Sequence, residues 1–484
     1  MLYPTIIQGG MGVGVSNYRL ARAVSKAGQL GVVSGTMLDT VLARRLQDGD
    51  SDGLIRRAMC SFPIREISDR VFKDYYVAGG KSPEAPYKAV PMHTMCSSDS
   101  LISLTILANF VEVFLAKHGH EGIVGINYLT KIDLPTLPSI FGAMLAGVDY
   151  VLMGAGIPRA IPGILDFLSE KKPVSMRIDV EGSKPDDNFT VNFDPGQFEI
   201  QAAKLKRPRF LAIVSSSVLA QSLAKKSSGT VDGFVVEHHC AGGHNAPPRG
   251  GITTDASGEP IYGPKDEIDT EGFKRLGLPF WLAGGYGSPE GLKLALQAGA
   301  RGIQVGTLFA FCKESGITPS IKKKVVDLVK SNSAEVFTDP LASASSYPFK
   351  VVTVESSLSE QEIYFSRDRI CDLGYLRQAY KKEDGNVGFR CPGEPVDAYV
   401  RKGGLEESTC GRKCLCNGLF STVGLPQIRP TGYKEPPLVT AGKYLPEIAR
   451  IVSESNDSYS AQDVLRFLFN QVKQQQQKKQ ALLI

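Results

Sequence analysis

The stretch Val231-Asp-Gly-Phe-Val-Val-Glu-His-His-Cys-Ala-Gly-Gly-His244-Asn-Ala-Pro-Pro-Arg-Gly250 decides the fold class. Its apolar run, Phe234 to Val236, predicts a buried strand, and in parallel α/β proteins the chemistry lies at strand ends. Gly242 and Gly243 carry no Cβ, so the backbone there can approach a flat ligand closely. Alone, a Gly-Gly-His sequence is more often a surface turn. In this context we expect His244 at the C-terminal edge of this strand, as a candidate general base.

Composition excludes several function classes. The chain has 484 residues, 42% of them hydrophobic, which is enough for one large core and a smaller second unit. Basic residues exceed acidic ones by only five (55 against 50), so we expect no nucleic-acid partner. We read no apolar run approaching the roughly 18–20 residues of a membrane span. The N-terminus enters a strand without a charged leader, so a cytoplasmic protein is expected.

Strand-like runs alternate with helical patterns through the first 310 or so residues. The candidates are Thr5 to Gln8, Gln29 to Ser34, Gly122 to Asn127, Val148 to Met153, Val174 to Ile178, Phe210 to Val214, Gly233 to Val236, Phe280 to Ala283 and Gly302 to Val305. This alternation is typical of a parallel sheet with crossover helices. Nine candidates compete for the eight places of a (β/α)₈ barrel. We leave out Val174 to Ile178, because the polar stretch Glu181 to Pro195 after it looks like an excursion.

The predicted domains are an α/β TIM barrel over residues 1–320 and a C-terminal extension over 321–484, mixed or helical in structure. Insertions are expected near 61–98, which looks irregular, and near 173–195 and 245–270. Ser16 is the predicted cap of the first helix, and a later helix is expected around Leu101 to Lys117. Turn residues from Thr338 to Lys350 suggest a loop that reaches back over the barrel mouth, and the Gln-rich tail Gln474 to Gln480 should fray.

An open dinucleotide-binding fold is the main alternative, because four glycines from Gly9 to Gly14 lie between a strand and a helix. The fingerprint fails in detail. Counted from Gly10, the spacing Gly-x-Gly-x-x-Gly requires a glycine at the position of Val15. The end of the second predicted strand, Ser34-Gly-Thr36, also has no acidic residue that could bind a ribose. The barrel is therefore favoured.

Two consecutive strand–glycine–helix units predict an anion site. The first runs from Pro279 through Gly284 and Gly285, with Ser288 as N-cap and Pro289 at the first helical position. The second is Gly299-Ala-Arg-Gly-Ile-Gln304-Val-Gly306-Thr307. Backbone N–H groups near helix starts bind anions, and TIM barrels often hold a phosphate after strands seven and eight. Ordinary βα loops are the alternative.

The nine cysteines, an odd number, fit reduced thiols better than a disulfide framework. Cys391, Cys410, Cys414 and Cys416 fall within 26 residues and could hold zinc or an iron–sulfur cluster. Their spacing matches no standard ligand pair, so we expect buried free thiols and no metal.

Taken together, these motifs resemble the nitronate monooxygenase family, formerly called 2-nitropropane dioxygenases. The resemblance rests on Ile6 to Gly14, the Gly-Ile-Asn127 strand end, Ala241-Gly-Gly-His244, Ala283-Gly-Gly285 and Gln304-Val-Gly-Thr307, and it covers roughly residues 4–312. It implies a TIM barrel that binds flavin mononucleotide (FMN). The family has long forms with a C-terminal extension, which this chain would match.

The resemblance also implies a role for each matching residue. His244 would be the catalytic base. The cofactor would contact Gly10, Met11, Asn127, Glu237, Gly242, Gly243, Gly284, Gly285, Gln304, Val305, Gly306 and Thr307, with its phosphate on Gly284, Gly285, Gly306 and Thr307. Glu237 stands where the family usually has glutamine, and His238-His239-Cys240 is a second departure. A carboxylate beside an electron-rich flavin would be repulsive unless paired or protonated.

Three functions follow as alternatives. The first is an FMN-dependent oxidation of a nitronate, or a related carbon acid, by dioxygen. The second is an ene or enoyl reduction that uses NAD(P)H, and the third is a non-catalytic flavin- or phosphate-binding protein. In each case the partner is a small molecule, and a homo-oligomer is compatible with the sequence.

Overall fold

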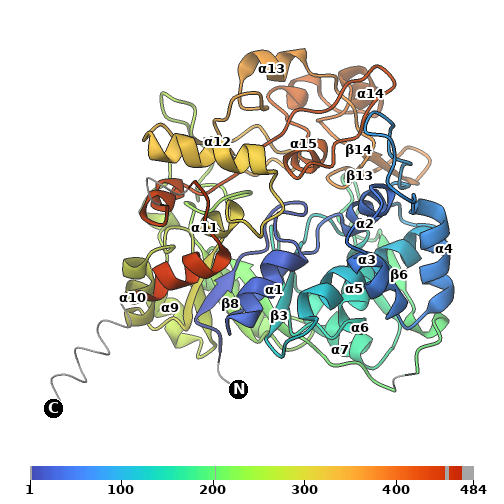
Figure 1. Ribbon diagram of the computed structural model, residues 1–484, viewed down its shortest axis with the longest axis horizontal. Helices are drawn as coiled ribbons and strands as arrows, with labels where there is room; N and C mark the ends of the chain where they lie inside the picture. Colours follow the sequence, from blue (N-terminus) through green and yellow to red (C-terminus); the bar gives the residue numbers. More distant parts are fainter. Residues whose placement is uncertain (1–2, 202, 453–456, 471–484) are drawn as a thin grey trace.

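A computed structural model of the chain describes residues 3–201, 203–452 and 457–470. At its centre is an eight-stranded parallel sheet in the order β1-β10-β9-β8-β7-β4-β3-β2. The sheet closes on itself, because Gln8 N–H donates to Leu30 O and Leu30 N–H to Ile6 O, joining the first and second strand regions. The protein is therefore a (β/α)₈ barrel, as the sequence predicts (Figure 1).

The barrel strands follow the predicted order closely. They are β1 (Ile6–Gln8), β2 (Gly31–Ser34), β3 (Val124–Leu129), β4 (Tyr150–Gly154), β7 (Arg209–Val214), β8 (Gly233–Glu237), β9 (Phe280–Ala283) and β10 (Gly302–Val305). The run left out of the barrel, β5 (Val174–Arg177), pairs antiparallel with β6 (Thr190–Phe193) in a separate hairpin. The prediction that the chain leaves the barrel after its fourth strand is therefore confirmed.

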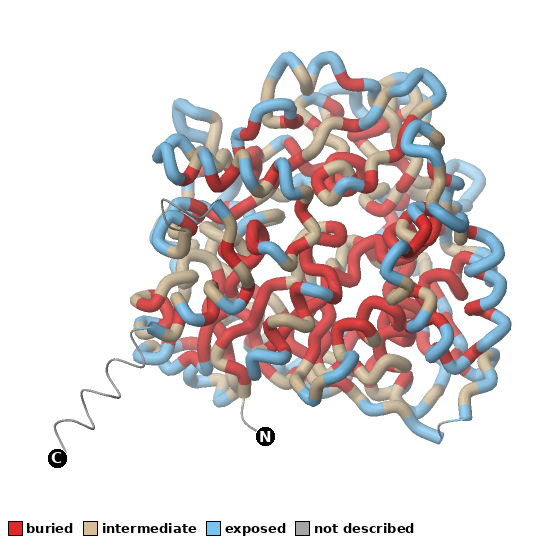
Figure 2. The backbone as a smooth tube through the Cα atoms, viewed as in Figure 1, coloured by how far each residue is buried: buried red, intermediate tan, exposed pale blue. Residues whose placement is uncertain are grey.

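Two apolar layers hold the barrel together. Alternate strand residues such as Val32, Leu152, Leu211, Val235 and Trp281 form an inner cluster, and Trp281 donates its indole N–H to Pro4 O at 2.8 Å. The intervening residues pack outward against the helices. Figure 2 shows buried residues running through the middle of the molecule. This period-two alternation follows from strand geometry.

Helices surround the barrel. They are α1 (Tyr18–Lys26), α2 (Leu38–Gln47), α3 (Leu54–Cys60), α4 (Arg65–Tyr75), α5 (Asp99–Lys117), α6 (Thr136–Leu145), α7 (Ile161–Ser169), α8 (Ser217–Lys226), α9 (Thr270–Arg275), α10 (Pro289–Gln297) and α11 (Thr307–Ala310). The structure corrects two expectations. Asn17, not Ser16, caps α1, since its side chain accepts from Leu20 N. The segment 61–98 is not wholly irregular, because it contains α4.

Helix α5 also corrects the membrane argument. By length and composition it passes the test for a membrane-spanning helix, contrary to our reading of the sequence. In the fold, 78% of the apolar stretch of this helix is buried, and α1, α2 and α6 pack against it. Its apolar character is accounted for by this core position.

The C-terminal extension covers the upper end of the barrel in Figure 1. Its elements are α12 (Pro319–Lys330), β11 (Val336–Asp339), β12 (Phe349–Val352), α13 (Gln361–Ser366), β13 (Gln378–Lys381), β14 (Val387–Arg390), α14 (Val396–Arg401) and α15 (Leu415–Thr422), and residues 461–470 are also helical. Buried Arg44 of α2 lies over the Phe420 ring at 4.4 Å and donates to Leu425 O. Extension and barrel share one apolar core. The Gln-rich tail lies outside the described residues.

Candidate active site at the barrel mouth

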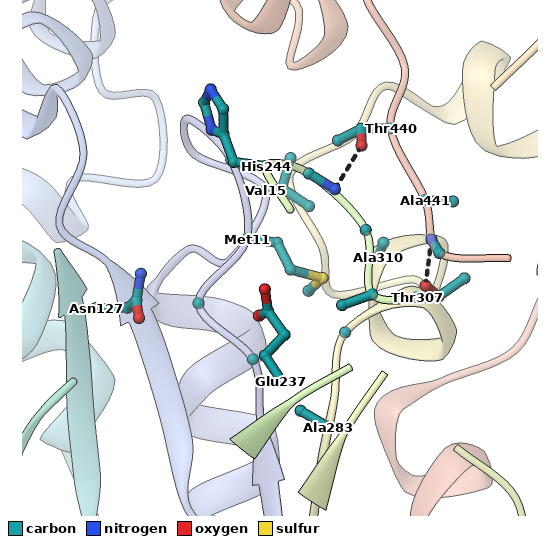
Figure 3. Close-up of a pocket in the computed structure, with 18 of the residues that line it drawn as sticks. Met11, Val15, Asn127, Glu237, His244, Ala283, Thr307, Ala310, Thr440 and Ala441 are labelled. Carbon is teal, nitrogen blue, oxygen red and sulfur yellow. Dashed lines mark hydrogen bonds between the residues drawn. The ribbon is translucent and has the colours of Figure 1, made fainter. Parts of the chain in front are cut away.

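A cavity of about 240 Å³ lies where the barrel strands end. Every residue predicted for the site lines it, from strands β1, β3, β8, β9 and β10 or the loops after them: Gly10, Met11, Asn127, Glu237, Gly242, Gly243, His244, Gly284, Gly285, Gln304, Val305, Gly306 and Thr307. Figure 3 shows Met11, Asn127 and Glu237 around this space. Residues nearly 300 positions apart in sequence thus meet in one pocket, as parallel strand ends require.

The turn after β1 is held by Ser16. Its hydroxyl donates to Gly9 O at 2.8 Å and accepts from Met11 N at 2.9 Å. The predicted cap residue therefore organises the pocket wall instead of the helix start. Gly10 lies so close to the Asn127 side chain that a Cβ at position 10 would overlap it. This close approach explains the need for glycine here.

The turn between β9 and α10 has the features expected of an anion site. Gly284 and Gly285 adopt φ values of 75° and 90°, which favour glycine. Ser288 caps α10 by accepting from Gly291 N, and Pro289 is the first helical residue, both as predicted. Gly306 and Thr307 border the same cavity, and α10 directs its N-terminus to this end of the barrel.

Glu237 ends β8 and points its carboxyl group into the pocket (Figure 3). Within the described chain this carboxyl makes no hydrogen bond. Burial raises its pKa to about 7, against a smaller opposing effect from the Lys350 ammonium. A protonated carboxyl at this position removes the charge repulsion that the sequence raised as a difficulty.

His244 lies beside the extension. Its Nε2 is 2.7 Å from Ser343 Oγ, and its ring packs edge-on against Phe349 at 5.0 Å between centroids. Burial, with a smaller effect from the Lys131 ammonium, lowers the pKa of His244 to about 4. In Figure 3 the imidazole points away from Glu237. His244 is therefore neutral at physiological pH, the form that a base requires.

The extension supplies pocket residues that sequence reasoning missed. Thr440 Oγ1 accepts from Gly243 N at 3.0 Å, and Gly442 N donates to Thr307 Oγ1 at 2.9 Å (Figure 3). Phe349 and Tyr444 line the cavity as well. The predicted return of loop 338–350 over the mouth is confirmed by Phe349. Nothing in the sequence near Thr440 forms a known motif, so only the fold reveals its position.

A second cavity, of about 440 Å³, adjoins the first. Both cavities share Ile132, Ala155 and Leu376 in their walls. The second is more polar, since Lys131, Asp133, Asp179 and Ser345 line it. Burial lowers the pKa of Lys131 to about 8 and raises that of Asp133 to about 6. The mouth thus has an inner apolar chamber and an outer charged one.

All nine cysteines are free thiols, as expected. Cys416 is buried, Cys391 and Cys414 are half-buried, and Cys410 is exposed, so the expectation of buried thiols is wrong for Cys410. Among the described residues, the group with metal-ligand spacing is His238, His239 and Cys240. The buried Lys350 ammonium, which donates to His239 O at 2.6 Å, places a positive charge beside this group and opposes a cation there.

Fold and site define the class: a (β/α)₈ barrel with a glycine-lined pocket at its strand ends. Residues 170–341 match the family model for nitronate monooxygenase, which confirms the resemblance over that part of the chain. The chain is 30% identical over 140 residues to a probable nitronate monooxygenase of Bacillus subtilis, covering 29% of this chain and 38% of that protein. For a probable nitronate monooxygenase of Staphylococcus saprophyticus the identity is 29% over 161 residues, covering 33% and 43%. The chain spans less than half the length of these curated relatives.

Two solved structures align with this chain at low sequence identity. FabK from Thermotoga maritima aligns at 15% identity and a TM-score of 0.49, over 99% of this chain and 96% of the other. Nitroalkane oxidase from Streptomyces ansochromogenes aligns at 15% identity and a TM-score of 0.45, over 99% and 98%.

The pocket fits the cofactor that the family implies. Gln304 Oε1 is buried in the wall with no hydrogen-bond partner among the described residues, so a ligand with a donor group would satisfy it. The left-handed backbone at Gly284 and Gly285 and the α10 N-terminus offer N–H groups to a phosphate. The residues present are therefore compatible with a flavin cofactor that carries a phosphate.

Proposed function

We propose that this protein is an FMN-dependent oxidoreductase that oxidises a nitronate or a related carbon acid with dioxygen, using His244 as base. The observation that carries the proposal is the single pocket that joins a neutral histidine, a glycine-rich anion cradle and an unpartnered Gln304 oxygen. The family match over residues 170–341 supports it.

Different pocket residues would bind different parts of the cofactor, and another would handle the substrate proton. Gly284, Gly285, Gly306 and Thr307 would hold the FMN phosphate, and Asn127 and Gln304 would bond to its polar groups. When bound, FMN supplies an electron acceptor that dioxygen can reoxidise. Glu237, whose pKa is raised to about 7, would face the ring with less negative charge than an ordinary glutamate. His244 Nδ1 makes no hydrogen bond to a described residue, so this nitrogen is available to take a proton from the substrate carbon.

The alternative is an NAD(P)H-dependent ene or enoyl reductase. A specific observation favours keeping it: the polar second cavity adjoins the pocket and offers space for a larger acceptor than a nitroalkane. In that reaction His244 would return a proton to the acceptor instead of removing one.

The substitution His244→Asn tests the role of the base. It should leave FMN bound, because the cofactor contacts lie on other residues. Turnover of neutral nitroalkanes, which must lose a proton, should fall about 10²–10⁴-fold, as expected for lost general-base catalysis. Preformed nitronates should be affected far less. Steady-state rates on both substrate forms give the answer, and equal small effects on the two would show that His244 is only a structural neighbour.

A further inference from the structure

A chain of hydroxyl groups leads from His244 out of the inner pocket. His244 Nε2 is 2.7 Å from Ser343 Oγ, which is 2.8 Å from Ser345 Oγ. Ser343 is fully buried, whereas Ser345 is partly exposed and lines the second cavity. The two serine hydroxyls therefore connect the candidate base to the polar second cavity, which His244 itself does not line.

The hydrogen-bond capacity of Ser343 allows two arrangements of this chain. Its Oγ has two acceptor lone pairs and one proton, and Ser345 N–H occupies one lone pair at 3.1 Å. In the first arrangement Nε2–H donates to Ser343, which donates to Ser345. In the second arrangement, Ser345 donates to Ser343 and Ser343 donates to Nε2, which carries no proton. The two arrangements differ by the transfer of one proton along the chain.

We propose that Ser343 and Ser345 form a proton relay between His244 and the second cavity, an inference that rests on the proposed function. A substrate C–H proton would bind Nδ1, while the electron pair stays on the substrate. The Nε2 proton would pass to Ser343 Oγ, the Ser343 proton to Ser345 Oγ, and the Ser345 proton to water in the second cavity. One proton enters and one leaves, so the imidazole ends neutral. A reductase would run the same relay in reverse.

The surroundings explain why His244 needs such an outlet. Burial and Lys131 lower the pKa of His244 to about 4, so a lasting imidazolium is disfavoured. Lys131 donates to Ser345 O at 3.0 Å, and the Arg412 guanidinium donates to Ser343 O. Both cations lie beside the relay and disfavour a further positive charge there. A proton taken at one ring nitrogen is therefore best released from the other.

The extension holds the relay in place. Asp339 Oδ1 accepts from Leu341 N at 2.8 Å and from Ala342 N at 3.0 Å, and its Oδ2 pairs with Lys413 at 2.6 Å. Arg412 also donates to Leu341 O at 2.9 Å. The loop that carries both serines is thus fixed to residues 412 and 413. This gives the extension a direct part in the chemistry of the barrel.

The test compares Ser343→Ala and Ser345→Ala with the matched control Ser346→Gly, all in FMN-loaded full-length protein. Ser346 is exposed on the same loop and lies outside the relay, and its φ of 59° suits glycine. Its hydroxyl accepts a long hydrogen bond of 3.3 Å from Arg412 Nη2, whereas Arg412 Nη1 still holds the loop through Leu341 O and Ser343 O. Ser343→Ala should slow turnover of a neutral nitroalkane about 10²-fold and spare the preformed nitronate. Ser345→Ala should act in the same direction, and Ser346→Gly should match the parent.

A second readout does not depend on turnover. In protein with ¹⁵N-labelled histidine, the His244 signals, assigned with His244→Asn, report which ring nitrogen carries the proton. Ser343→Ala should change that distribution and Ser346→Gly should not. If Ser343→Ala and Ser346→Gly leave both rates and tautomers equal to the parent, the relay is wrong. A loss shared equally by nitroalkane and nitronate also overturns it. If the parent turns over neither substrate, the proposed function fails, and the tautomer response alone then decides the relay.

Discussion

At the scale of single residues, Glu237 departs most from the family pattern. A carboxylate beside a flavin would be repulsive. Burial reduces this repulsion, because it raises the pKa of Glu237 to about 7. The folded state then binds the Glu237 proton more tightly than the unfolded chain, whose glutamate titrates near its ordinary value. Protonated Glu237 is therefore the form compatible with this pocket.

This linkage predicts a pH-dependent stability. The contribution of Glu237 is fully present below about pH 4.5 and is lost as the pH rises through about 7. The amide of Glu237→Gln does not titrate, so the variant should gain stability relative to the parent across this window, by at most about 3 kcal/mol. Unfolding temperatures of the flavin-free proteins at several pH values measure the difference. If the unfolding temperatures of the two proteins changed with pH in parallel, the buried, protonated carboxyl would be contradicted.

At the scale of elements, the glycine turn between β9 and α10 carries the cofactor assignment. A side chain at Gly285 would meet the Tyr444 ring at 3.0 Å and intrude on the pocket. Gly277 has a similar left-handed backbone, with φ of 69°, but open space around it. The two positions share backbone strain and differ in their distance from the site.

We therefore expect Gly285→Leu to fold and to be purified without FMN, whereas Gly277→Leu should retain it. Backbone strain of about 1–2 kcal/mol is common to both variants. Flavin content, from absorbance after gel filtration, and circular dichroism make the comparison. A Gly285→Leu protein as yellow as the parent would show that this turn does not hold the phosphate.

The same elements show what the sequence could reveal. Strand order, the β5–β6 excursion and the α10 cap follow from local patterns, because strand alternation and capping depend on neighbouring residues. The role of Ser16 and the position of helix α4 did not follow. Ser16 bonds to a turn instead of a helix end, and the Pro- and Gly-containing segment around α4 hides an amphipathic stretch that packs on α2 and α5.

At the scale of the whole molecule, the extension and the barrel form one structure. Thr440 and Gly442 reach the pocket from outside the barrel sequence, and together with Ser343 they bond to residues of the β8 and β10 loops. Such contacts join residues about 100 to 200 positions apart. No local periodicity encodes them, so they could not be predicted from the sequence.

The central claim is that the whole protein binds FMN and uses it to oxidise a nitronate. Anaerobic mixing of the FMN-loaded protein with a nitronate, NADH or NADPH, while the visible flavin band is followed, tests it most directly. The account predicts that the nitronate bleaches the band, that dioxygen restores it, and that neither nicotinamide acts quickly. Rapid bleaching by NADPH or NADH, reversed by an enoyl acceptor, with no response to the nitronate, would contradict it and assign a reductase.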